Sequence, residues 1–269
     1  MFFCSKVMNF NVKNATAFLT FKELERFKFL KHAFSTRLGG VSEGYFKSMN
    51  LGRKTNDLAE NVEKNYDSFC GSLDIKKSDM IFSNQIHSDK IKIASYEIDD
   101  EDGFDGLITN KKGIVIATSH ADCSPVYIVD PIKKAIGLAH AGWRGTIKNI
   151  AGKMILKMNE VFGCNPSDLV CGIGPGICKS CFEIDKEIAD KFKEFPFGNL
   201  VFSKKIKKFN ISISEANKQN LIIQGVKENN IFVSEICNKC CNYILFSKRA
   251  SKGKGYGLNI AVMSLVDPA

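Results

Sequence analysis

The stretch SHADCSPVYIVDPIKKAIGLAHAGWRG, residues 119–145, decides the fold of this chain. Two apolar runs within it, residues 126–129 and 135–139, have the composition of buried strands, and Asp130-Pro131 between them suits a hairpin turn. The second run continues through a glycine-rich segment into residues 146–162, where apolar side chains repeat at helical spacing. We therefore predict a strand hairpin that leads into a helix.

Apolar patterns elsewhere predict more strands than helices. The helices are expected at residues 57–73, 185–195 and 214–224. The strands are expected at residues 80–86, 90–94, 113–118, 169–173, 231–235 and 257–265. Hairpins among so many strands favour an α+β fold over a doubly wound parallel sheet. We find neither a repeat nor a linker in the sequence, so we predict a single domain over residues 1–269.

Composition limits the class of protein. The chain has 269 residues, 44% of them hydrophobic and 25% charged, which is enough to bury a core without disulfides. No apolar run approaches the roughly 20 residues of a membrane span, and the first residues do not resemble a signal peptide. Ten cysteines without a secretory signal indicate a reducing compartment. We predict a cytoplasmic protein with mostly free thiols and no membrane partner.

The formal net charge of +9 raises the question of a nucleic-acid partner. The excess consists mostly of lysine and is spread along the chain, with its densest cluster at Lys204, Lys205, Lys207 and Lys208. That cluster lacks the interleaved aromatic residues on which bases stack. We interpret the charge as a solvated surface and predict no nucleic-acid partner.

Three side chains suit a metal ion: His87, Cys123 and His140. Imidazole and thiolate are ligands that zinc prefers, with copper as the alternative, and three protein ligands leave a fourth position for water. The three are spread over the chain, so a buried cysteine with hydrogen-bonded histidines remains an alternative. His120 ranks lower, because an odd offset from Cys123 along a strand would place it on the opposite face.

Cys123 and His140 also have the chemistry of a nucleophile and its base. The orienting acid would then be Asp122 or Asp105. The sequence alone leaves this alternative open.

Two glycine-containing segments are candidates for binding or catalytic turns. In residues 141–145, backbone N–H groups and the guanidinium of Arg144 could hold an anion at a helix start, with an ordinary turn as the alternative. Residues 40–44 match the nucleophile motif GxSxG, but no strand–turn–helix pattern surrounds them, so we reject the match.

Two cysteine pairs have the internal spacing of a zinc ribbon: Cys178 with Cys181, and Cys237 with Cys240. The gap between the pairs is far longer than the ~15–20 residues usual in a ribbon. We expect buried thiols here rather than a structural zinc ion.

Several segments together resemble the YfiH-like proteins, also called laccase-domain or multicopper polyphenol oxidase-like proteins. The resemblance covers most of the chain, and HAGWRG with ADCxP is its most specific part. The matching segments are TRLGGVSEGYFKSMNLG, NQIHSDKI, FDGLIT, ADCSPVYIVD, HAGWRGTI, GIGPGI and FSKR.

The resemblance implies a fold and a chemistry. The fold is a single-domain layered α/β/β/α sandwich with mixed sheets. The implied metal ligands are the histidine of QxH, the cysteine of ADC and the histidine of HAGWRG, which are His87, Cys123 and His140 here. The implied activity is phosphorolysis of adenosine, inosine and methylthioadenosine to the free base and ribose 1-phosphate, with deamination of adenosine. Copper-dependent phenol oxidation is the older attribution.

The chain departs from the family pattern at a few positions. His120 stands where a small hydroxyl residue is usual, and Cys178 replaces a glycine. Near the end, Gly257-Leu258 stands where Gly-Arg is common, which leaves Arg249 of FSKR as the nearby arginine.

We therefore predict a zinc-dependent purine nucleoside phosphorylase with adenosine deaminase activity, whose partners are purine nucleosides and phosphate. The alternatives are a cysteine hydrolase, a copper-dependent polyphenol oxidase and a non-catalytic metal-binding protein. Four histidines are too few for the several copper centres of a laccase. The oligomeric state stays open, with a homodimer among the candidates. The predicted site residues are His87, Cys123 and His140 for the metal, Arg53 and Arg144 for phosphate or ribose, and Asp122 for orientation or proton transfer.

Overall fold

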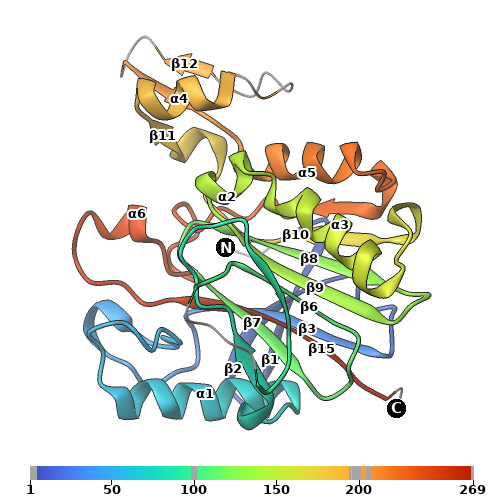
Figure 1. Ribbon diagram of the computed structural model, residues 1–269. Coiled ribbons are helices and arrows are strands. Elements are labelled where there is room, and N and C mark those ends of the chain that lie inside the picture. Colours follow the sequence, from blue (N-terminus) through green and yellow to red (C-terminus); the bar gives the residue numbers. More distant parts are fainter. Residues whose placement is uncertain (1–4, 98–101, 194, 196–200, 204–206, 268–269) are drawn as a thin grey trace.

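The chain folds into two face-to-face β-sheets with helices on both outer faces (Figure 1). The computed structural model describes residues 5–97, 102–193, 195, 201–203 and 207–267. This four-layer arrangement confirms the predicted α+β fold of α/β/β/α layers with mixed sheets.

Each of the two large sheets has six strands, and each contains parallel and antiparallel pairs. Sheet one is ordered β1 (Met8–Lys13), β2 (Thr16–Phe21), β3 (Leu30–Ser35), β15 (Asn259–Leu265), β7 (Val115–His120), β4 (Met80–Phe82). Sheet two is ordered β14 (Ile231–Val233), β10 (Val170–Ile173), β8 (Ser124–Asp130), β9 (Ala135–Ala141), β6 (Gly106–Thr109), β5 (Ile91–Ile93).

The central strands are buried on both faces. In β7, Ile116 packs in the cluster between the two sheets, whereas its neighbours Val115 and Ala117 pack in the cluster under helix α1. In β9, Leu138 packs between the sheets and Ala139 packs under the helices of the other side. Because successive side chains point to opposite faces, strands covered on both sides appear in the sequence as continuous apolar runs.

The helices lie on the outside of the sandwich. Helix α1 (Ala59–Leu73) covers sheet one, and α3 (Ile150–Phe162) and α5 (Ile213–Ile223) cover sheet two (Figure 1). Helix α6 (Lys248–Ser251) is a single turn in the loop before β15. Among the described residues, no helix is both long and apolar enough to cross a bilayer.

The predicted helix over residues 146–162 is in fact two helices, α2 (Trp143–Ile147) and α3. Asn149 separates them with a left-handed backbone, φ 62°, and its side-chain oxygen accepts the N–H of Gly152 at 3.0 Å. An asparagine adopts this conformation more easily than most residues and caps a helix well, so one residue ends α2 and begins α3.

The predicted hairpin is confirmed as the antiparallel pair β8–β9, with Ser124 opposite Ala141 and Asp130 opposite Ala135. The carboxylate of Asp130 accepts two backbone N–H groups of the turn, each at 2.8 Å, as expected for an aspartate that begins a turn. The strand predicted at residues 80–86 stops at Phe82, and the rest forms a loop.

An appendage, made of the described residues between 182 and 210, lies beyond the sandwich next to α2 (Figure 1). It holds β11 (Glu183–Ile184), α4 (Lys186–Lys193), β12 (Val201–Ser203) and β13 (Lys208–Asn210), with sheet order β11-β13-β12. Its apolar side chains pack against Trp143 and Ile147 of α2.

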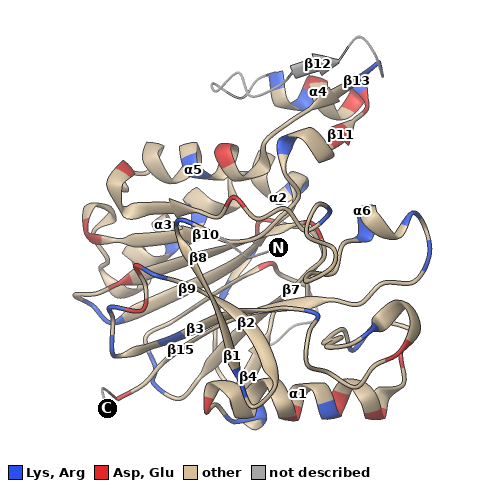
Figure 2. Ribbon diagram, turned by 180° about the vertical axis from the view of Figure 1, so that it is seen from behind, with Lys and Arg blue, Asp and Glu red and all other residues tan. Residues whose placement is uncertain are grey.

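Charged residues of both signs occur on the exposed helices α1 and α5 (Figure 2). On α1, for example, Lys64 pairs with Glu60. Lys204 and Lys205 of the predicted basic cluster lie outside the described residues, and Lys208 forms an ion pair with Asp185. This mixed pattern favours a solvated surface over a nucleic-acid site.

Candidate metal centre and adjoining cavity

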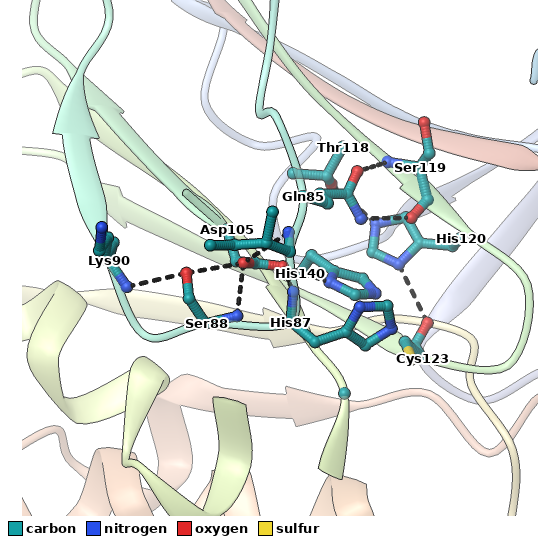
Figure 3. Close-up of polar contacts among 12 residues, drawn as sticks. Gln85, His87, Ser88, Lys90, Asp105, Thr118, Ser119, His120, Cys123 and His140 are labelled. Atoms are coloured by element: carbon teal, nitrogen blue, oxygen red, sulfur yellow. Dashed lines mark hydrogen bonds and ion pairs between the residues drawn. The ribbon is translucent and has the colours of Figure 1, made fainter. Parts of the chain in front are cut away.

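The side chains of His87, Cys123 and His140 converge where strands of both sheets end. His87 lies in the loop after β4, Cys123 lies between β7 and β8, and His140 is the next-to-last residue of β9. Their ligand atoms all lie within 4.8 Å of one another, and the two imidazole rings are 4.9 Å apart and nearly perpendicular (Figure 3). His140 is buried, Cys123 is half-buried and His87 is exposed. One nitrogen or sulfur atom from each residue could therefore reach a common ion.

Asp105, just before β6, orients His140 and the loop that carries His87. Its Oδ1 accepts Nδ1–H of His140 at 2.8 Å and the backbone N–H of His87 at 3.1 Å. Its Oδ2 accepts the backbone N–H groups of Ile86 at 3.2 Å and Ser88 at 2.6 Å, and the Ser88 hydroxyl at 2.8 Å (Figure 3). Because the proton on Nδ1 is held by Asp105, Nε2 is the nitrogen of His140 that can bind a metal, once it has given up its own proton.

His120 supports Cys123 and does not join the group of ligands. Its Nδ1 faces the Cys123 carbonyl at 3.0 Å, which can only accept, so Nδ1 carries the proton. Its Nε2 then accepts the hydroxyl of Thr118 at 2.7 Å. Burial, followed by the charge of His140, holds the pKa of His120 well below its usual value. The expectation of opposite faces on one strand was wrong, because β7 ends at His120 and a turn follows.

The backbone around the group is specialised. His87 and Asp122 both have left-handed φ angles, 60° and 92°, which non-glycine residues adopt at a cost of about 1–3 kcal/mol. Gly142 lies beneath the ligands: a Cβ there would be 2.9 Å from Sγ of Cys123 and 3.2 Å from Cδ2 of His87. The first glycine of HAGWRG therefore makes room for the three side chains.

Cys123 and His140 influence each other's protonation. Burial alone would raise the pKa of the Cys123 thiol, but the charge of His140 and hydrogen bonds from both histidines outweigh it and lower this pKa to about 6. Burial opposes charge on His140 as well, yet the Cys123 thiolate and Asp105 raise its pKa to about 9. Without a metal, the pair is therefore an imidazolium beside a thiolate.

A cavity of about 440 Å³ opens beside the three ligands, which form part of its wall. Apart from the small residues Ser83, Ser119 and Ala121, its other side chains are of three kinds: cations, amides and large apolar or aromatic groups. They are Arg53, Lys54 and Lys248; Asn84 and Gln85; and Leu51, Tyr66, Phe82, Tyr256 and Leu258. Cations beside aromatic walls suit a ligand that carries both an anionic group and a flat ring.

Arg53 is held in place on this wall. Its guanidinium lies 4.4 Å from the ring centre of Tyr66 and 5.2 Å from that of Phe82, and Nε contacts Glu63 at 3.2 Å. The stacked, paired arginine keeps donors of its fork available to a further anion.

Two of the predicted site residues lie off the cavity wall. Arg144 is exposed and its guanidinium stacks 4.3 Å from the ring centre of Trp143. The carboxylate of Asp122 accepts the Ser247 hydroxyl at 2.5 Å and the backbone N–H of Arg249 at 2.6 Å. Asp122 thus fixes the loop that carries Lys248 to the cavity.

The rejected GxSxG match has a structural role. Ser42 is buried, and its hydroxyl accepts the side-chain amide of Asn65 at 2.9 Å. Only a single 3-10 turn, Gly44–Phe46, follows it.

Sequence reasoning missed several contributors to the site. Gln85 pairs with the backbone of Ser119 in both directions, at 2.7 and 2.8 Å, and so extends the β4–β7 pairing beyond Phe82. Lys54, Lys248 and Tyr256 line the cavity. No local pattern marks these residues, because they come from loops that only the folded sheets bring together.

Comparison with known proteins assigns the family. Residues 31–266 match the family described as multi-copper polyphenol oxidoreductase laccase. The purine nucleoside phosphorylase YlmD of Bacillus subtilis is 30% identical over 82% of this chain and 84% of its own length. A protein from an unknown prokaryotic organism, named adenosine deaminase RL5, is 31% identical over 84% of this chain and 93% of its own length.

Solved structures agree with this assignment. The crystal structure of YlmD from Geobacillus stearothermophilus has a TM-score of 0.87 at 28% identity, and covers 96% of this chain and 99% of that one. The relatives are named as enzymes, which confirms the expectation that the protein is an enzyme.

Proposed function

The chain belongs to the multi-copper polyphenol oxidoreductase laccase family, and we propose that it is a purine nucleoside phosphorylase with a zinc ion on His87, Cys123 and His140. The observation that carries this proposal is the convergence of these three ligands on the wall of a cavity lined by cations and aromatic rings. Relatives named purine nucleoside phosphorylase and adenosine deaminase support the choice of substrate.

The donor set fits a single borderline metal ion. The hydrogen bond that Nδ1–H of His140 donates to Asp105 reserves Nε2 for the metal, Gly142 leaves space among the ligands, and the Cys123 thiol ionises readily. Zinc held by three ligands supplies a Lewis acid with an open position, at which the pKa of water falls to about 7.

A true multi-copper oxidase does not fit the chain. This chain contains four histidines in all. His32 uses Nε2 to accept the backbone N–H of Phe21, and His120 uses both ring nitrogens in hydrogen bonds. Only His87 and His140 remain for metal, too few for several copper centres.

The chain's own residues would bind and orient the substrates. Arg53, with Lys54 and Lys248 nearby on the wall, would hold phosphate next to the ribose carbon. Tyr66, Phe82 and Tyr256 would enclose the purine and exclude water. The phosphate oxygen then forms a bond to C1′ as the C1′–N9 bond breaks, and the departing base takes the electron pair and a proton. The products are the free base and ribose 1-phosphate.

The proposal includes hydrolytic deamination of adenosine in the same cavity. Water adds at C6 and ammonia leaves, so that adenosine becomes inosine. This reaction needs no phosphate, which separates it experimentally from phosphorolysis.

The test combines metal analysis with chromatography of adenosine incubated with the full chain, with and without phosphate. We expect zinc bound to the group of His87, Cys123 and His140, adenine and ribose 1-phosphate only when phosphate is present, and inosine in either case. Cys123→Ser is expected to lose that zinc ion and both activities. Unchanged adenosine, inosine and methylthioadenosine would refute the proposed function.

One observation favours a second candidate, a cysteine hydrolase. Cys123, His140 and Asp105 are arranged in order as nucleophile, base and orienting acid. A hydrolase of this kind would be inactivated by alkylation of Cys123 in protein stripped of metal and would work without zinc. The zinc enzyme would instead lose activity on stripping and regain it when zinc is restored.

A further inference from the structure

The fold brings the four cysteines of the two Cys-x-x-Cys pairs together. The sulfur atoms of Cys178, Cys181, Cys237 and Cys240 all lie within 4.8 Å of one another, and those of Cys181 and Cys240 are 3.4 Å apart. The expectation of buried thiols was wrong for three of them: Cys240 is exposed, and Cys178 and Cys181 are half-buried. This cluster is separate from the group of His87, Cys123 and His140.

The long gap between the pairs no longer argues against a shared site. Gly176 and Cys237 form an isolated parallel bridge, in which the N–H of Gly176 donates to Ile236 at 3.3 Å and the N–H of Asn238 donates to Gly176 at 3.1 Å. The intervening chain forms the appendage, α5 and β14 before it returns to this bridge. Two short segments therefore present their cysteines side by side, as the two halves of a zinc ribbon do.

Backbone hydrogen bonds fix the cysteine segments, and one N–H group points at a sulfur atom. The first pair closes a 3-10 turn, in which the N–H of Cys181 donates to the carbonyl oxygen of Cys178 at 3.0 Å. The N–H of Cys178 donates to the sulfur of Cys237, at 3.3 Å. Such a donor stabilises a thiolate, and the sequence places Lys179 and Lys239 between the cysteines of the two pairs.

We propose that Cys178, Cys181, Cys237 and Cys240 bind a structural zinc ion as four thiolates. A tetrahedron with Zn–S bonds of about 2.3 Å has sulfur–sulfur edges of about 3.8 Å, which matches a cluster within 4.8 Å. Iron–sulfur clusters spread their cysteines over several iron atoms and hold them farther apart. Two disulfides would need two isolated sulfur pairs at about 2.05 Å, whereas here all four atoms share one neighbourhood. Four protein ligands close the coordination sphere, which is the pattern of structural sites.

The site would fasten the appendage to the loop that borders the cavity. Beyond Cys240 the chain continues to Lys248 on the cavity wall. Arg249 also bridges the two parts: it donates to the backbone carbonyl of Glu183 at 3.2 Å and lies 5.5 Å from the ring centre of Phe182. Loss of the zinc ion would release one end of both segments while leaving the sandwich intact.

The experiment measures metal per chain in the full-length protein and in matched cysteine variants, by plasma mass spectrometry after purification under reducing conditions. The pair variant Cys181→Ser/Cys240→Ser should contain one zinc ion fewer per chain than the unmodified protein. It should keep the zinc ion on His87, Cys123 and His140, which Cys123→Ser loses. Cys241→Ser, next to the cluster but outside it, should keep the full content.

Cobalt substitution of the unmodified chain adds a readout that does not depend on variant folding. A tetrathiolate site gives intense visible bands of tetrahedral cobalt and a sulfur-to-cobalt charge-transfer band that scales with the number of thiolates. Presence of this signature in Cys123→Ser supports the proposal even if the proposed phosphorylase site fails. Cobalt bands of one thiolate at most, or a pair variant with unchanged zinc, would overturn it.

Discussion

Asp105→Asn is expected to weaken the metal centre without touching any ligand. Asp105 is fully buried and accepts five hydrogen bonds, divided between its two oxygen atoms. Burial opposes its charge, but bonds from His140 and Ser88 outweigh this and hold its pKa below the usual value. The side-chain amide of asparagine has one acceptor, its oxygen, and one donor group, its NH₂. Because both oxygens of Asp105 accept hydrogen bonds, the NH₂ group of the asparagine would face N–H or O–H donors on one of the two sides.

Either orientation of the amide is costly. With its NH₂ group toward His140, it would force the proton onto Nε2 and remove the lone pair that binds metal. With its NH₂ group toward Ser88, it would break the two backbone bonds made by Ile86 and Ser88. Outer-sphere partners of this kind are worth about 10–100-fold in metal affinity, or ~1.4–2.7 kcal/mol. Losing bonds to a buried charge should lower the unfolding free energy of the metal-free protein by about 3–5 kcal/mol.

Zinc titration against a chromogenic chelator measures the first quantity, and urea unfolding of metal-free protein measures the second. The affinity is measured for the zinc ion on His87, Cys123 and His140, which is the zinc ion that Cys123→Ser lacks. Ser88→Ala is the matched control, since it removes one donor to Oδ2 and leaves the bond from His140 to Oδ1. It should cost about 1–2 kcal/mol of stability and leave zinc affinity within a few-fold. If Asp105→Asn binds zinc as tightly as the unmodified chain, Asp105 does not set the His140 tautomer.

Three further predictions concern space, charge and pH. Gly142→Ala should lower zinc affinity about 5–150-fold, because its Cβ would lie 2.9 Å from Sγ of Cys123 and overpacking costs about 1–3 kcal/mol. Gly71→Ala is the control: a Cβ there would have nothing within 4 Å, so this variant should bind zinc like the unmodified chain. Arg53→Ala should raise the KM for phosphate about 10–100-fold in steady-state assays while the KM for nucleoside changes less; an unchanged phosphate KM would exclude the assigned role. Burial, only partly offset by a backbone hydrogen bond, lowers the pKa of His32 from 6.5 to about 4. As pH falls below 6.5 the unfolded chain therefore takes up the proton first, and stability declines down to about pH 4. Urea unfolding at pH 7 and 5 should show the unmodified chain losing about 2 kcal/mol more than His32→Gln, and equal losses would contradict the assignment.

The parts of the fold that follow from local pattern could be predicted from the sequence. The β8–β9 hairpin and helix α1 have long apolar patterns, and both are observed. Strand β1 was not identified, because its six residues, MNFNVK, are only partly buried at a sheet edge and mix polar with apolar residues. The break at Asn149 was missed because the apolar spacing continues across it.

The site could be predicted only in part, for a reason that lies in the topology. The chain passes from sheet one to sheet two between His120 and Ser124, and Cys123 lies within this crossing. Two distant contacts hold the crossing: the Asp122 carboxylate accepts the hydroxyl of Ser247, and the Asp122 carbonyl accepts Ile177 N–H at 2.7 Å. A local contact, from His120 to the Cys123 carbonyl, adds to them.

Ligand type is a local property that a sequence displays, which is why His87, Cys123 and His140 could be singled out by chemistry and resemblance. The positions of the ligands depend on residues that carry no metal-binding chemistry in themselves. Asp105 lies 35 residues before His140 yet fixes its ring, and it can do so only because β6 pairs with β9. The same holds for the four cysteines, whose two segments meet through the Gly176–Cys237 bridge. Spacing along the chain is therefore a poor guide to a shared site wherever strand pairing brings together segments that are far apart in the sequence. The convergence of donor atoms in the folded chain is the better criterion.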